Sequence, residues 1–113
     1  METINILYIG KHPEIMETVV RLINKNELWT GLGTTDENEA VTLFKNNSIC
    51  LVLLGCGIDE QTEISLRSFF TQHNPKTKII QHYGGGSGLL YNEIQAALNN
   101  DPEIINFLSQ FNA

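Results

Sequence analysis

Three apolar runs in this chain each end on a glycine: INILYIG (residues 4–10), ICLVLLG (residues 49–55) and KIIQHYG (residues 78–84). They are almost continuously apolar, as the strands of a parallel sheet are when helices cover both faces. A weaker run, LWTGLGT (residues 28–34), contains two glycines and predicts a second, looser strand. Together, the four runs predict a parallel sheet at the centre of the fold.

Segments with helical spacing separate these runs. Pro13 suits a first helical turn and predicts a helix over residues 13–25. Asp36 and Asp59 are typical caps for a second and a third helix, and the third should end before Pro75. The side chains expected to face the sheet are Ile15, Met16, Val19, Val20 and Ile23, then Ala40, Val41, Leu43 and Phe44, then Ile64, Leu66, Phe69 and Phe70.

Two more helices are expected after the fourth strand. The first would bury Leu90, Ile94, Ala97 and Leu98, and the second would begin at Asp101. Strands that alternate with helices favour a parallel sheet with right-handed crossovers. At 113 residues we expect one domain, residues 1–113, with a three-layer α/β/α architecture, a four-stranded parallel sheet in the order 2-1-3-4 and a CheY-like or flavodoxin-like fold.

Composition argues against several classes of function. Thirteen acidic and seven basic residues give a net charge of -6, and the basic residues are scattered along the chain. Nucleic-acid binding draws on clustered Lys and Arg, and anionic membranes attract the same residues, so neither partner is expected. No apolar run approaches the roughly 20 residues of a membrane helix.

The cysteines and the first residues predict a cytoplasmic protein. Cys50 and Cys56 lie at opposite ends of one extended run, roughly 20 Å apart at about 3.3 Å per residue, which is beyond disulfide reach. Two free thiols suit a reducing compartment. The start METINILYIG enters an apolar strand without the basic residues and long apolar stretch of a signal peptide, which gives the same expectation.

The order and spacing of residues 4–84 resemble a known family. The segment ILYIGKHPEIMETVVRLI resembles the opening of bacterial response-regulator receiver domains, in which an apolar strand ends in two acids before the first helix. CLVLLG resembles the third receiver strand, which ends in the aspartate that accepts phosphate. The resemblance implies a receiver-like domain of bacterial signalling.

The residues that would carry receiver chemistry are different here. Gly10 and Lys11 stand where the family has the acids that hold magnesium, and Gly55 stands where it has the phosphoacceptor aspartate. None of the three offers a carboxylate for a hard divalent ion or for phosphoryl transfer. Tyr83, with His82 as the alternative, falls at the family's Thr or Ser switch position.

The family also has a fifth strand and helix, for which this chain has little length. Helix starts at Ser87 or Gly88 and at Asp101 leave no extended run, so we expect the fifth strand to be absent. The alternative is a remnant of it at residues 88–90. If the fifth strand is absent, the fourth strand lies at an open edge of the sheet, which proteins cover or pair. We therefore expect a homodimer through the strand-four edge or the last helix.

The most motif-like stretch is the loop at residues 84–88. Its glycines could point backbone N–H groups at a phosphate or another anion. A phosphate-binding P-loop needs a lysine followed by Ser or Thr, and no lysine lies after Lys78, so a flexible loop is the alternative. The candidate anion-binding residues are Gly84, Gly85, Gly86 and Ser87.

Cys56 is the candidate nucleophile, because it follows a strand between two glycines and His12 and His82 could lie near it. The alternative is a small, semi-buried thiol that fits a tight turn. The separated histidines form no spaced pair for a metal, so no metal or other cofactor is expected. Trp29 could be either a surface anchor for a partner or a half-buried strand residue.

These features predict a non-enzymatic, receiver-like interaction module that cannot be phosphorylated and that acts through a protein partner. The alternative is a binder of small anionic ligands, or a minor enzyme. It would use residues 84–88 with Cys56 and His12 at the strand ends.

Overall fold

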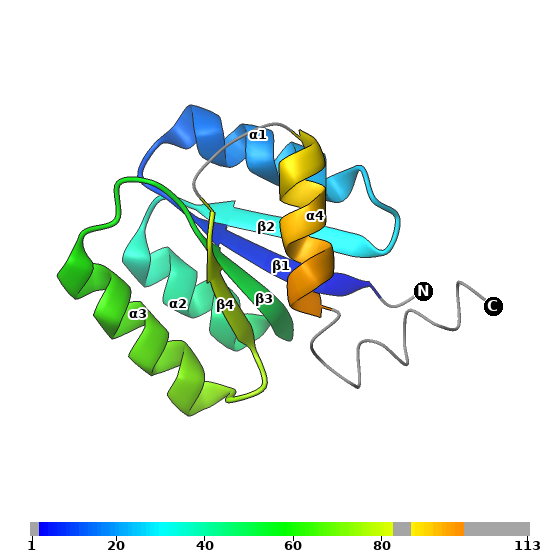
Figure 1. Cartoon of the computed structure of the whole chain (residues 1–113). Helices are drawn as coiled ribbons and strands as arrows, with labels where there is room; N and C mark the ends of the chain where they lie inside the picture. The colour runs from blue at the N-terminus through cyan, green and yellow to red at the C-terminus, as the bar shows by residue number, and fades with distance from the viewer. Residues whose placement is uncertain (1–2, 83–86, 99–113) are drawn as a thin grey trace.

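The computed structural model describes residues 3–82 and 87–98, in which strands and helices alternate (Figure 1). None of the helices in these ranges has the length and apolar character needed to cross a membrane. The elements are β1 (Ile4–Ile9), α1 (Pro13–Asn24), β2 (Trp29–Thr34), α2 (Glu37–Asn46), β3 (Ile49–Leu54), α3 (Glu60–His73), β4 (Lys78–Gln81) and α4 (Ser87–Leu98).

The described strands form one parallel sheet in the order β2-β1-β3-β4, which confirms the predicted order and fold class. β1 is central, and its first residue, Ile4, pairs with Trp29 of β2. The fourth strand is shorter than the predicted run, because pairing with β3 covers only residues 78–81. The predicted helix from Asp101 and the segment at residues 83–86 lie outside the described residues.

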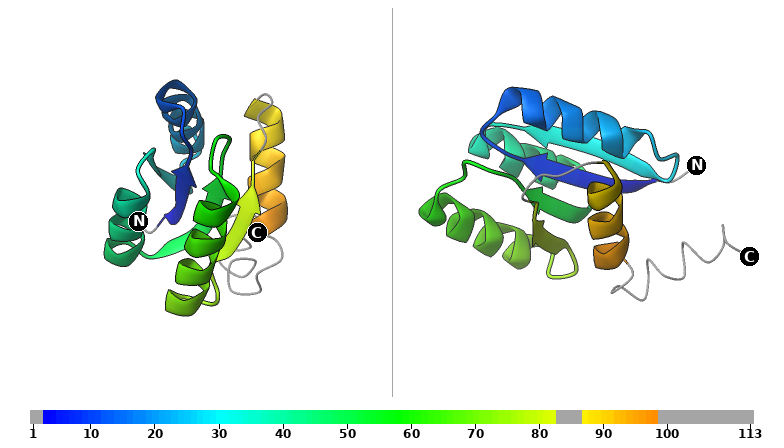
Figure 2. Two further views of the ribbon diagram at one scale, coloured as in Figure 1. Left: turned by 90° about the vertical axis from the view of Figure 1, so that its left-hand side faces the viewer. Right: turned by 45° about the horizontal axis from the view of Figure 1, so that its top comes forward.

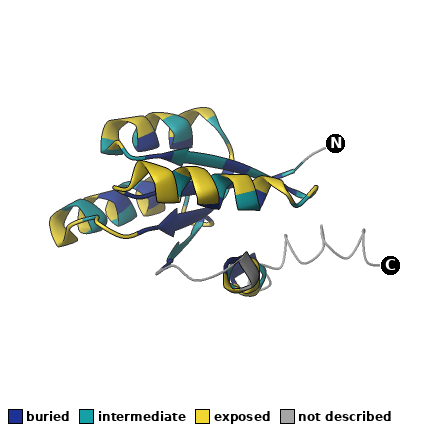
Figure 3. Ribbon diagram, turned by 90° about the horizontal axis from the view of Figure 1, so that it is seen from above, coloured by how far each residue is buried: buried dark blue, intermediate teal, exposed yellow. Residues whose placement is uncertain are grey.

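Helices cover both faces of the sheet, as Figure 2 shows. Successive strand residues point to opposite faces, so β1 contributes to two buried clusters. Ile6 and Tyr8 belong to the cluster beneath α1 and α4, whereas Leu7 and Ile9 belong to the cluster beneath α2 and α3. This double burial, visible in Figure 3, is the reason for the almost continuous apolar runs.

Local signals start the helices at the predicted positions. Pro13 occupies the first turn of α1. The Asp36 carboxylate accepts the Asn38 N–H at 3.0 Å, and the Asp59 carboxylate accepts the Thr62 N–H at 2.7 Å. These bonds satisfy backbone donors that a helix leaves without partners at its first turn.

Two predicted inner residues are wrong. Ile15 of α1 is 43% exposed and Ile64 of α3 is 54% exposed, whereas Leu66 and Phe70 of α3 are buried against the sheet. At 3.6 residues per turn, side chains two residues apart point in directions that differ by about 200° around the helix axis. Ile64 and Leu66 therefore cannot face the same side. The apolar character of Ile64 therefore does not indicate burial.

The glycines of β2 allow close packing, where the sequence suggested only a looser strand. A Cβ on Gly33 would lie 2.5 Å from Cγ2 of Val20, and one on Gly31 would lie 3.0 Å from Cβ of Ile23. The Asn24 side chain adds two hydrogen bonds to the Gly31 backbone, at 2.8 and 3.3 Å. The two glycines thus let α1 lie directly against β2.

Candidate functional site at the carboxyl end of the sheet

The strands β1 and β3 end side by side. The Gly55 N–H donates to the Ile9 carbonyl at 2.7 Å, and the Gly10 N–H donates to the Thr34 carbonyl at 3.2 Å. After β1 the chain turns toward β2, and after β3 it turns toward β4. Ligands of open α/β sheets bind at such a switch point, so this is the place for a site.

The phenol of Tyr8 fills the space between these strand ends. Tyr8 is 2% exposed and points to the same face of β1 as Gly10, two residues further on. A Cβ built on Gly10 would lie 2.9 Å from the Tyr8 hydroxyl oxygen, and one on Gly55 would overlap that hydroxyl and lie 2.5 Å from Cζ. No side chain fits at either glycine unless Tyr8 moves.

Sequence reasoning missed the role of Tyr8, although its contact with Gly10 could have been predicted. A large aromatic residue two positions before a glycine in a strand lies on the same face, which suggests that Gly10 makes room for Tyr8. The contact with Gly55 had no such signal, because it depends on the register between β1 and β3.

The Lys11 side chain is engaged with α2. Its ammonium lies 3.3 Å from Oε1 of Glu37, which also accepts the Thr62 hydroxyl at 3.2 Å. Both charged groups are partly exposed, so the pair contributes well under about 1 kcal/mol. The N–H of Thr62 holds the pKa of Asp59 below its ordinary value, and Lys11 lowers this pKa further. The carboxylates of Glu37 and Asp59 therefore already have partners.

Cys56 is exposed, which corrects the expectation of a semi-buried thiol. Its carbonyl accepts the Lys11 N–H at 3.2 Å, and the next residue, Gly57, has a φ of 89°, a conformation that favours glycine. A Cβ on Gly57 would lie 3.8 Å from Nε2 of His12, so this imidazole lies beside the loop. Within the described ranges, no hydrogen bond joins the thiol to an imidazole.

His82 is buried, and its side chain has a partner other than Cys56. It is 4% exposed, and its Nδ1 lies 3.1 Å from a carboxylate oxygen of Glu93 on α4. Its backbone N–H donates to the Leu54 carbonyl at 2.8 Å, and its ring meets the Tyr8 ring edge-on at 6.4 Å. The sequence analysis missed the Glu93 partner, because no local spacing links a strand end to the next helix.

The remaining candidate residues are only partly described. Ser87 begins α4, while Gly84, Gly85, Gly86 and Tyr83 lie outside the described residues. Where the structure describes the chain, no three or more His, Cys, Asp or Glu side chains gather in a group that could hold a metal ion.

No family model matches this chain, and no curated protein matches it in sequence. Solved structures do match it. A signal receiver domain of an HD domain-containing protein from Pseudomonas fluorescens Pf-5 aligns with a TM-score of 0.61 at 13% identity, over 88% of this chain and 97% of that one. The chain has the receiver-domain fold.

Two structures of the response regulator RcsB lead to the same conclusion about the fold. The non-phosphorylated receiver domain from Escherichia coli aligns with a TM-score of 0.60 at 13% identity, over 85% of this chain and 76% of that one. RcsB from Salmonella typhimurium, studied for DNA interaction, aligns with a TM-score of 0.59 at 15% identity over 74% of this chain. This receiver-like chain spans 43% of that longer protein.

The contact between Tyr8 and Gly55 predicts that substitutions at these two residues have coupled effects on the free energy of unfolding. Gly55→Ala should lower the free energy of unfolding by about 1–3 kcal/mol, because its Cβ overlaps the phenol. In a Tyr8→Leu background the same change should cost at least about 1 kcal/mol less. Chemical denaturation of the four proteins measures the coupling. Ala40→Gly, in the cluster on the other face of the sheet, is the control and should cost the same in both backgrounds.

Burial also predicts a pH dependence. Burial raises the pKa of the Tyr8 hydroxyl above its ordinary value of 10.0, and the nearby Cys56 raises it further. The folded state thus holds this proton more tightly than the unfolded state. The resulting stabilisation is complete below pH 10.0 and is lost as the pH rises through the folded pKa. The free energy of unfolding, measured with urea, should fall more steeply above pH 10.0 for the wild type than for Tyr8→Phe. Parallel curves of this free energy against pH would contradict the prediction.

Proposed function

We propose that this chain is a non-enzymatic, receiver-like protein-interaction module that does not accept phosphate. The observation that carries the proposal is the phenol of Tyr8 in the space between Gly10 and Gly55. These are the positions at which the resemblance to receiver domains would place a metal-binding acid and the phosphoacceptor. Here an aromatic side chain fills the volume that their carboxylates would need.

The charges around the strand ends support the same proposal. Magnesium binds through several carboxylate or water oxygens, and phosphoryl transfer at this site needs a carboxylate nucleophile. Glu37 accepts hydrogen bonds from Lys11 and Thr62, and Asp59 caps α3. The Lys11 ammonium would also repel a divalent cation placed beside it.

What the fold still offers is a rigid surface for contacts in a signalling assembly. Exposed large apolar side chains lie on α1 and α4, which cover the same face of the sheet: Ile15 is 43% exposed, Leu89 49% and Tyr91 47%. Protein partners commonly use such exposed apolar residues. This supports a role in protein binding and gives no reason to assign a reaction.

A phosphorylation assay tests the proposal directly. The full chain, incubated with Mg²⁺ and acetyl phosphate, should give no phosphoryl adduct by intact mass spectrometry, and beryllofluoride should leave its NMR spectrum unchanged. A receiver domain that keeps its acids is the positive control. Tyr8→Ala opens the space without adding a carboxylate, so it should also stay unmodified. A stoichiometric adduct on the wild type would contradict the proposal.

We also propose that the partner includes a second copy of this chain, through the β4 edge. β4 has β3 on one side as its neighbour in the described sheet, and its four residues are all partly exposed. Light scattering of the full chain over a wide concentration range should report two 12.7 kDa chains. A monomer at the highest concentration would sink this proposal.

A further inference from the structure

The outer edge of β4 has no neighbouring strand among the described residues. The His82 N–H donates to the Leu54 carbonyl at 2.8 Å, so the backbone of His82 points toward β3. This direction alternates along a strand. Ile80 therefore also points its N–H and C=O groups toward β3, whereas Ile79 points them outward. An edge of this kind is a template for pairing with another strand.

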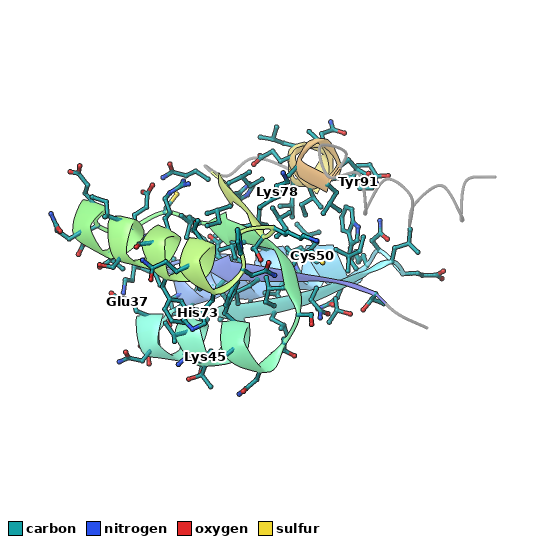
Figure 4. The ribbon with its side chains drawn as sticks, turned by 90° about the horizontal axis from the view of Figure 1, so that it is seen from below. Glu37, Lys45, Cys50, His73, Lys78 and Tyr91 are labelled. Carbon is teal, nitrogen blue, oxygen red and sulfur yellow. The ribbon has the colours of Figure 1, made fainter. Side chains whose placement is uncertain are left out.

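The side chains along β4 alternate between the two faces of the sheet. Ile80 packs against the cluster beneath α1 and α4, whereas Ile79 packs against the cluster beneath α2 and α3. Lys78 and His82 lie two residues on either side of Ile80, so they share the α4 face. Figure 4 shows Lys78 on the α4 side of the molecule and Lys45 on the α2 side. The α4 face of this edge thus has a lysine at one end and a histidine at the other.

The two ends of this face carry opposite charges. The Glu93 carboxylate lies 3.1 Å from Nδ1 of His82, and the Glu93 side chain is 23% exposed, which leaves room for a second donor. Lys78 is partly exposed, and no carboxylate in the described part of the chain pairs with its ammonium. A second copy turned end for end would bring each lysine to the other copy's acid, so the edge is complementary to itself.

We propose that two copies of this chain pair their β4 strands antiparallel about a two-fold axis at Ile80, and that Lys78 of each copy pairs with Glu93 of the other. The proposal rests on the homodimer proposed above and adds its register and its charged contact. Ile80 then lies opposite its own copy on the axis. Lys78 lies opposite His82 of the second copy, beside the Glu93 carboxylate, and by symmetry this contact occurs twice.

The turn before β4 argues against the neighbouring register. A two-fold axis perpendicular to the sheet keeps every side chain on its own face, so the axis has to pass through a residue. An axis at Ile79 would place the Lys78 ammonium opposite the apolar Ile80 and would draw Thr77 into the pairing. Thr77 is buried, and its N–H already donates to the Asn74 carbonyl at 3.1 Å. The axis at Ile80 avoids both conflicts.

A lysine on an edge strand commonly has the opposite role, because its charge keeps other strands away. The two roles give opposite expectations for a variant that lacks the positive charge. If Lys78 guards the edge, its replacement strengthens self-association, whereas if Lys78 pairs with Glu93, its replacement weakens it. Both groups are partly exposed, so the pair selects the register more than it adds affinity.

Charge reversal tests the ion pair in the full chain. Lys78→Glu should raise the dimer Kd, measured by sedimentation equilibrium, at least about tenfold, because two attractions become two repulsions. Combining it with Glu93→Lys should recover most of the affinity, since each reversed charge again meets its opposite. Lys25→Glu, at the end of α1, makes the same change in net charge and should leave the Kd unchanged. The NMR spectrum of each variant confirms folding before the measurement.

Two cysteine variants test the register. Facing residues of a non-hydrogen-bonded antiparallel pair have Cα atoms about 4.5 Å apart, which is within disulfide reach. Ile80→Cys should therefore give a disulfide-linked dimer on mild oxidation, detected on a non-reducing gel. Ile79→Cys is the matched control, because its two copies lie two residues out of register and more than about 8 Å apart. Both variants keep the native thiols of Cys50 and Cys56, so these contribute equally.

The outcomes separate this proposal from the homodimer itself. A wild-type dimer whose Ile80→Cys variant cross-links no better than Ile79→Cys would overturn the register and leave the homodimer standing. A wild-type monomer would remove both. A tighter dimer of Lys78→Glu, or a charge-swapped protein that associates no more tightly than Lys78→Glu alone, would show that Lys78 does not pair with Glu93.

Discussion

The packing of the Tyr8 phenol between the ends of β1 and β3 is the contact on which the character of this molecule depends. It explains both glycines at once, because a Cβ at Gly10 or Gly55 would meet the Tyr8 ring or hydroxyl. A receiver fold normally keeps this space for acidic side chains and their ligands. Here the Tyr8 side chain, which is buried in the core, occupies the same space.

Helix α4 connects this packing to the rest of the same face. Its Glu93 carboxylate lies 3.1 Å from Nδ1 of His82, the residue after β4, and the His82 ring in turn meets the Tyr8 ring edge-on. Two residues earlier, Tyr91 packs on Trp29 at the start of β2. One helix thus contacts both the residue that packs on Tyr8 and the Trp29 ring.

The layers of this fold and the side chains at its usual site can be considered separately. The carboxyl end of the sheet, where open α/β proteins usually bind ligands, is occupied by Tyr8 and by paired charges. The layers of a fold depend on many buried strand residues, whereas a site depends on a few side chains, so the two can vary independently.

The amino-acid sequence by itself determined the layers of this protein. Continuous apolar strands, helical stripes and capping residues such as Asp36 and Asp59 are local patterns, and they predicted the strand order and the helix starts. It also showed that Gly10, Lys11 and Gly55 bring no carboxylate to the strand ends.

Only the tertiary structure decided which side chain occupies the space between the strand ends. The contacts of Tyr8 with Gly55, His82 with Glu93 and Trp29 with Tyr91 join residues from different elements. Such contacts depend on strand register and helix placement, which local spacing does not encode. Even within one helix, the exposed Ile64 shows that an apolar residue is placed by its angle around the axis, because packing selects only one face.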